Sequence, residues 1–144
     1  MLRNIPEIIT PELMKIIMEM GHGDEICFGD INFPAQSSGT RVVRCDGHSV
    51  KPLLDAVLQF FPLDTFIPNP VSLMQRVHDE DPIPKVWDEY RSIIKKNDFS
   101  HAFTDFDMLE RYSFYMRAKK CYAVVATSEK EAYACMILTK GVIF

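Results

Sequence analysis

The sequence lacks any long apolar run, which limits the places where the protein can act. No stretch approaches the roughly 20 consecutive apolar residues of a membrane-spanning helix. The first residues, 1–7, lack the apolar segment of a secretory signal peptide. We therefore expect a protein that acts away from membranes, without a membrane partner.

Positive charge is also scarce, and the cysteines are few and unpatterned. Lys and Arg number 16 against 20 Asp and Glu, so the net charge is -4 and no basic stripe appears. This balance argues against a nucleic-acid partner. The four cysteines, at positions 27, 45, 121 and 135, show no Cys-x-x-Cys spacing. Partly buried, reduced thiols in a cytoplasmic protein are the expected state.

Several motifs of known chemistry are missing. The sequence has no Gly-x-Ser-x-Gly elbow, no Gly-rich phosphate loop and no dinucleotide fingerprint. Asp24 and Glu25 lie close to His22 in the sequence, but no further His or Cys stands at ligand spacing. We therefore expect no metal site and no bound cofactor.

The 144 residues, 47% of them hydrophobic, are enough for one domain, which we expect over residues 1–144. Apolar spacing predicts alternating strands and helices. The strands are expected over 26–28, 40–45, 64–67, 71–77, 122–126 and 135–138. The helices are expected from the Thr10 cap to Gly21, from the Ser49 cap to Phe61, over 84–94 and from an Asp107 cap to Ala118. A loop is expected over 32–39. This alternation predicts a single-domain α/β layered fold whose mixed, largely parallel sheet is covered by helices.

Two polar residues flank the first predicted strand. His22 lies between two glycines, where the backbone can turn tightly, and an imidazole can both give and take a proton near neutral pH. A loop histidine that caps the helix C-terminus is the other interpretation. Asp30 follows the same strand and could hold substrate hydroxyls or orient a histidine, or simply form an Asx turn.

A third candidate lies on the helix expected after position 107. Arg111 and Tyr115 are four residues apart, so they share a helix face that could bind a sugar through a guanidinium and a ring. A packed helix with solvated arginines is the alternative. His48, His78 and His101 stand in polar surroundings and are expected on surface loops.

At these residues the sequence resembles the fucose mutarotase and D-ribose pyranase family (RbsD/FucU). The resemblance runs through Thr10-Pro11-Glu12-Leu13, Gly21-His22-Gly23-Asp24-Glu25 and Asn32-Phe33-Pro34-Ala35 to the closing Ile137-Leu138-Thr139-Lys140-Gly141. Gly-His-Gly-Asp-Glu and Asn-Phe-Pro-Ala together are similar to the fucose branch. The family interconverts the α and β anomers of free sugars, and some members convert ribose between ring sizes.

The resemblance also implies roles for particular residues. His22 matches the family's catalytic histidine, whereas Asp30, Arg111 and Tyr133 match residues that bind the sugar. Cys135 stands where the family has Asn, and a thiol is a weaker hydrogen-bonding group than an amide. The implied mechanism has His22 protonate the ring oxygen, without a metal or redox cofactor. The general base stays unassigned.

His22 and Asp30 stand at opposite ends of the predicted strand, roughly 16 Å apart for about five residues. Either the loop over 21–23 folds back, or different subunits share one pocket. The family forms homo-oligomers, commonly decamers of stacked pentameric rings, which favours a shared pocket. The alternatives that stay open are a D-ribose pyranase, a mutarotase of another sugar, a non-catalytic sugar-binding protein and a ring protein with a vestigial pocket.

Overall fold

The computed structural model describes residues 1–39 and 41–144, and its centre is one mixed sheet. The strands lie in the order β2-β5-β1-β6-β3-β4. Their bounds are β1 (Glu25–Gly29), β2 (Val42–Cys45), β3 (Val71–Met74), β4 (Asp107–Leu109), β5 (Ala123–Thr127) and β6 (Met136–Thr139). β6 is antiparallel to both neighbours, β1 and β3, whereas the other three pairs are parallel. The prediction of an α/β fold with a largely parallel sheet is confirmed.

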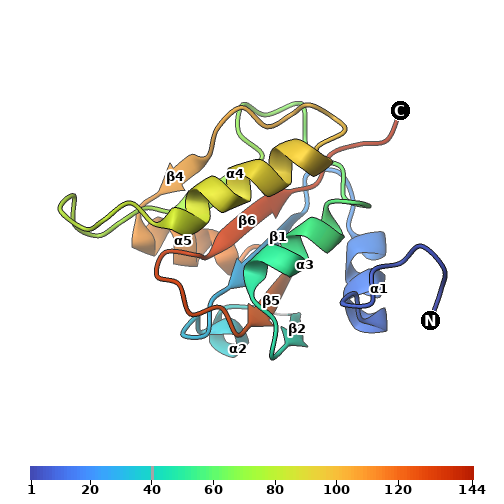
Figure 1. The fold of residues 1–144 in the computed structure, drawn as a ribbon, viewed down its shortest axis with the longest axis horizontal. Helices are drawn as coiled ribbons and strands as arrows, with labels where there is room; N and C mark the ends of the chain where they lie inside the picture. The colour runs from blue at the N-terminus through green and yellow to red at the C-terminus, as the bar shows by residue number, and fades with distance from the viewer. Residues whose placement is uncertain (40) are drawn as a thin grey trace.

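Helices cover the two faces of the sheet unequally. The larger core lies beneath α1 (Pro11–Glu19), α3 (Val50–Val57) and α4 (Lys85–Asn97), of which α3 and α4 lie in front of the sheet in Figure 1. The smaller core, on the opposite face, is formed with α5 (Arg111–Ala118) and the short α2 (Ala35–Ser38). No helix in the described part of the chain is long and apolar enough to cross a membrane.

Local sequence explains where the helices begin. Thr10 caps α1 as expected, because its hydroxyl accepts a hydrogen bond from the Leu13 amide at 3.1 Å. Ser49 occupies the N-cap position of α3, but its side chain makes no capping bond. The amide of Val50 donates instead to the buried carboxylate of Glu129 at 3.2 Å, 79 residues away. A hydrogen bond to a buried carboxylate far away in the sequence therefore replaces the local cap.

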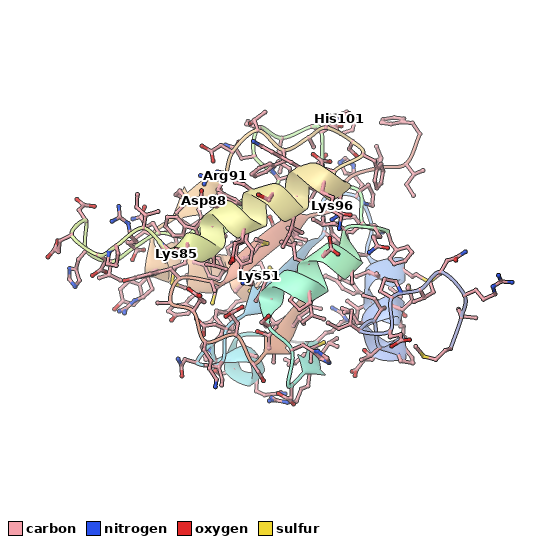
Figure 2. The ribbon with its side chains drawn as sticks, in the orientation of Figure 1. Lys51, Lys85, Asp88, Arg91, Lys96 and His101 are labelled. Atoms are coloured by element: carbon pink, nitrogen blue, oxygen red, sulfur yellow. The ribbon has the colours of Figure 1, made fainter. Side chains whose placement is uncertain are left out.

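Ion pairs join the two helices on the outer surface. Figure 2 shows Lys51 on α3 and Lys85, Asp88, Arg91 and Lys96 along α4. Lys96 Nζ lies 2.9 Å from Asp55 Oδ1, and Lys51 Nζ lies 2.8 Å from Glu89 Oε2. The hydrogen bond from Lys96 is the main cause that lowers the pKa of Asp55. These exposed pairs join α3 to α4 but contribute little to stability.

Four local expectations need correction. Residues 64–67 form no strand, because only Leu63 makes a bridge, to Lys140. The loop expected over 32–39 contains α2, and the strand expected over 71–77 ends at Met74. Asp107 begins β4 rather than a helix, and Glu110 caps α5 in its place. Thr40, the expected first residue of the second strand, lies outside the described residues.

Candidate functional site

The loop that carries His22 is held to the end of β6. The backbone of Gly23 has φ 83°, a left-handed conformation that glycine adopts without strain. Its amide donates to the Lys140 carbonyl at 2.8 Å, and the Lys140 amide donates to the Asp24 carbonyl at 2.9 Å. The Lys140 ammonium group also donates to the Met20 carbonyl at the end of α1. These bonds to Lys140 hold the residues on both sides of His22, so the loop that carries the imidazole is held in place.

His22 is oriented by a carboxylate that the sequence did not point to. Its Nε2 lies 3.2 Å from Oδ1 of Asp64, and the two side chains are 46% and 4% exposed. The same oxygen accepts the Phe66 amide at 3.0 Å, and the Phe66 ring lies 5.3 Å from the imidazole. When Nε2 donates to Asp64, Nδ1 is the nitrogen left to exchange a proton with a ligand.

Asp30 lies at the opposite end of β1, in the turn that follows the strand. Its Oδ1 accepts the Asn32 amide at 2.9 Å, so the expected Asx turn is present. The Asp30 amide donates to Cys135 Sγ at 3.4 Å, and Cys135 is only 2% exposed. Cys135 therefore supports the backbone of Asp30 and does not face solvent.

The start of α5 lies near this turn. Glu110 caps the helix by accepting the amides of Tyr112 and Ser113, at 2.9 and 3.1 Å. The Arg111 guanidinium lies 5.0 Å above the ring of Tyr112 and donates to its hydroxyl. Arg111 therefore contacts Tyr112, while Tyr115, four residues on, belongs to the same helix.

Tyr115 is half-buried beside Phe33, with ring centroids 5.7 Å apart. Burial raises the pKa of the Tyr115 hydroxyl. The nearby Cys135 and Asp30 add to this effect, whereas Arg111 opposes it. Tyr115 therefore lies near enough to Arg111, Asp30 and Cys135 for them to affect the pKa of its hydroxyl.

Tyr133 precedes β6 in a strained conformation. Its φ of 59° is left-handed, which costs roughly 1–3 kcal/mol for a non-glycine residue. Hydrogen bonds hold it there: Trp87 Nε1 donates to its carbonyl at 2.8 Å, and its hydroxyl donates to Asp81 at 2.8 Å. The Val77 amide donates to the same hydroxyl at 3.2 Å.

The structure therefore divides the candidate residues between two edges of the sheet. Asp30, Arg111, Tyr115, Tyr133 and Cys135 gather where the parallel strands end, the edge at which such folds bind ligands. His22 and Asp64 lie at the opposite edge, beyond the far end of β6. The loop over 21–23 does not fold back, because Gly23 is bonded to Lys140. Within one chain, the five residues of β1 separate the two groups by roughly 16 Å.

Two hollows in the surface contain candidate residues from the edge where the parallel strands end. A pocket of about 130 Å³ is lined by Arg111, Tyr112 and Glu110 together with residues 75–77. Another, of about 500 Å³, lies between residues 81–85 and 131–133. A larger pocket, of about 710 Å³, lies between the N-terminal segment and α1 and contains none of the candidate residues. Its size therefore does not mark the chemical site.

The missed residue in this site is Asp64. It lies 42 positions from His22 in a stretch without a motif. Backbone contacts with the end of β6, among them the bridge between Leu63 and Lys140 and the bond from the Asp64 amide to the Thr139 carbonyl, bring it to the histidine. In the described residues, no group of three His, Cys, Asp or Glu side chains is arranged to hold a metal ion.

Comparisons with known proteins cover almost the whole chain. The model of the RbsD / FucU transport protein family matches residues 3–143. The fucose mutarotase of Homo sapiens is 41% identical over 148 aligned residues, covering 99% of this chain and 94% of that protein. The crystal structure of the fucose mutarotase from Streptococcus pneumoniae in complex with L-fucose is 43% identical, with a TM-score of 0.91, 99% of this chain and 100% of that chain covered.

A further solved structure agrees. FucU from Bifidobacterium longum is 46% identical, with a TM-score of 0.91, and 97% of this chain and 99% of that chain are covered. Sequence and fold thus agree along the full length, not only in the short motifs around His22 and Asp30. The chain belongs to the RbsD / FucU family.

Proposed function

We propose that this protein is a fucose mutarotase, an isomerase that interconverts the α and β anomers of L-fucose. The observation that carries the proposal is the pair formed by His22 and Asp64, a partly exposed imidazole on a nearly buried carboxylate 3.2 Å away. Relatives that share about 40% of the sequence over their full length are fucose mutarotases, one of them solved with L-fucose. They favour fucose over ribose as the substrate.

The reaction needs proton transfer at two oxygens of the sugar. His22 gives a proton to the ring oxygen as the bond between this oxygen and the anomeric carbon breaks. A base takes the proton of the anomeric hydroxyl, so the aldehyde forms. The aldehyde rotates, the ring oxygen attacks its other face, and both protons return. A positioned acid–base group contributes roughly 10²–10⁴-fold to such a step.

The residues at the other edge hold the sugar. Asp30 and Tyr133 bind hydroxyls by hydrogen bonds, Arg111 adds charged donors, and Tyr115 offers a ring for the apolar face of the sugar. Cys135 acts indirectly in this arrangement, through its contact with the Asp30 amide. An amide at this position would offer two donors and an acceptor that the thiol does not.

Neither edge suffices alone, so the complete site is shared between copies of the chain. His22 of one copy meets Asp30, Tyr133 and Arg111 of the next, in a homo-oligomeric ring for which the family's decamers of pentameric rings are the expected form. The separation of the two groups along β1 supports this arrangement. A cytoplasmic location is supported by the four cysteines, all of them free thiols.

Anomer exchange measured by saturation-difference NMR tests the function. Saturating one anomeric proton of L-fucose should transfer saturation to the other far faster with the protein than in buffer. His22→Ala should lower the exchange rate by roughly 10²–10⁴-fold. His48→Ala is the matched control, because His48 is an exposed loop histidine after β2 and is not among the candidate site residues.

The same measurement separates the alternatives. Faster exchange of ribose than of fucose would indicate a pyranase, and sugar binding without faster exchange would indicate a non-catalytic binding protein. Full activity of His22→Ala would overturn the assigned mechanism. Cys135→Asn should improve turnover of fucose if the missing amide limits the grip on the sugar.

A further inference from the structure

The hydroxyl group of Tyr133 is already engaged by the segment that joins β3 to α4. It donates to Asp81 Oδ2 at 2.8 Å and accepts the Val77 amide at 3.2 Å. A phenolic hydroxyl has one proton to donate and two lone pairs. With the proton committed to Asp81 and one lone pair to Val77, a single lone pair remains for a ligand.

Asp81 thereby determines whether the Tyr133 hydroxyl donates or accepts a hydrogen bond when a ligand binds. While the carboxylate holds the phenolic proton, Tyr133 can receive a hydrogen bond from a sugar hydroxyl but cannot give one. A hydrogen bond to an ionised acceptor is stronger than one between neutral groups, so water competes poorly for this proton. The carboxylate therefore fixes both the position and the polarity of the phenol.

Hydrogen bonds within the segment that carries Asp81 hold its backbone in place. The Arg76 guanidinium donates to the Asp79 carbonyl at 2.8 Å and also to the Asp81 carbonyl. The pocket of about 500 Å³ lies directly beside this contact, with Asp81 and Tyr133 among its lining residues. Loss of the Asp81 carboxylate would therefore loosen a wall of this pocket as well as the phenol.

We propose that Asp81 is a positioning residue for the sugar site, acting through Tyr133. Its carboxylate accepts the hydrogen bond of the Tyr133 hydroxyl. The hydroxyl oxygen is then left as a hydrogen-bond acceptor for one hydroxyl of the sugar. The inference deepens the proposed function and rests on it, because Tyr133 touches the sugar only if the site binds one. Asp81 itself makes no contact with the reacting atoms.

The test compares three variants in the full-length protein by NMR exchange at increasing fucose concentration. Asp81→Ala and Tyr133→Phe should each raise KM by about three- to tenfold, the range of one hydrogen bond, and leave kcat within about twofold. The double variant should be no worse than Tyr133→Phe, because both changes remove the same interaction. Asp79→Ala is the matched control, since the exposed Asp79 side chain makes no hydrogen bond with the described residues.

Amide hydrogen exchange provides a readout that needs no activity. The Val77 amide should exchange faster in both Asp81→Ala and Tyr133→Phe than in the wild type, and unchanged in Asp79→Ala. An additive loss in the double variant, or a fall in kcat at constant KM, would overturn the role of Asp81. A wild type that fails to exchange fucose anomers would overturn the proposed function, whereas unchanged KM in an active protein overturns the positioning role alone.

Discussion

The imidazole of His22 and the carboxylate of Asp64 lie 3.2 Å apart, although 42 residues separate them in the chain. The carboxylate is almost fully buried and the imidazole is half exposed. The carboxylate orients the ring by accepting a hydrogen bond from Nε2, and its negative charge faces the imidazole that is proposed to give a proton to a leaving oxygen. The pair thus supplies both the orientation and the electrostatic support of an acid.

Asp64→Asn should leave the imidazole in place but remove the charge behind it. We expect the fucose exchange rate to fall by about ten- to a hundredfold, less than the loss from removing the imidazole itself. Asp55→Asn is the control, because Asp55 also holds hydrogen bonds but lies between α3 and α4. Exchange at the wild-type rate in Asp64→Asn would show that the pair has no catalytic role.

Gly141 allows the stretch that carries Asp64 to approach β6. A Cβ at this position would lie 2.5 Å from the Leu63 carbonyl oxygen and 2.9 Å from the Asp64 Cα. Gly141→Ala should therefore cost about 1–3 kcal/mol of stability and slow fucose exchange by displacing Asp64. Denaturant titration and NMR exchange measure the two effects.

Gly47→Ala provides the comparison for this glycine. Gly47 has φ 84° with nothing within 4 Å of the added Cβ, in a turn after β2. Its replacement strains the backbone but should leave the exchange rate of fucose unchanged. Equal losses of activity in both variants would contradict the specific role assigned to the close approach at Gly141.

Arg117 joins the strands of the smaller core through two carboxylates. Its Nε lies 3.0 Å from Glu25 Oε1, and its Nη1 lies 3.1 Å from Asp107 Oδ2, while Thr139 donates to Glu25 at 3.1 Å. Arg117→Ala would leave two partly buried carboxylates without their cation. We expect a loss of about 2 kcal/mol in the free energy of unfolding, measured with urea.

Arg44→Ala serves as the surface counterpart of this change. Arg44 pairs with Asp46 at 2.7 Å, but both side chains are more than half exposed. Its removal should not change stability measurably. If Arg117→Ala also leaves the free energy of unfolding unchanged, the contacts of Arg117 with Glu25 and Asp107 do not hold β1 and β4 together.

Stability should fall at alkaline pH because of buried thiols. Burial raises the pKa of Cys45 from 9.0 to about 11 and that of Cys121 to about 12. Above pH 9 the unfolded chain loses these protons while the folded chain keeps them. The stabilisation is therefore complete below pH 9 and is lost progressively as the pH rises toward 11–12.

Cys45→Ala isolates one contribution to this loss. The difference in unfolding free energy between wild type and variant should shrink between about pH 8 and about pH 10.5. Urea titrations at the two pH values measure it. A constant difference would show that the Cys45 thiol ionises alike in both states.

Most elements followed from local patterns, and the exceptions have physical causes. α1 was predictable because Thr10, Pro11 and its apolar spacing act within one helix. β4 was not, since Asp107 is a good cap residue in isolation, and its pairing with Ser72 of β3 is a long-range contact. The strand expected to reach Val77 ends earlier, because the Val77 amide bonds the Tyr133 hydroxyl instead of a neighbouring strand.

The residues of the candidate site also fall into two groups: those that local motifs indicate and those that only long-range contacts reveal. The motifs around His22 and Asp30 and the resemblance to the family pointed to candidate residues, and their roles stay predictions. Asp64 and Asp81 could not be found, because each gains its partner through a contact of more than 40 residues in sequence separation. The spacing of β1 did indicate that His22 and Asp30 lie apart.

The reversed direction of β6 has a consequence for dilution. The strand begins beside Asp30 and ends beside the His22 loop, so in the proposed shared arrangement each chain contributes half of a site at each end of this strand. A closed ring of such chains contains as many complete sites as it has members, whereas a chain alone has none. The specific activity should then fall as the protein is diluted below the concentration at which the ring dissociates, even though every chain stays folded.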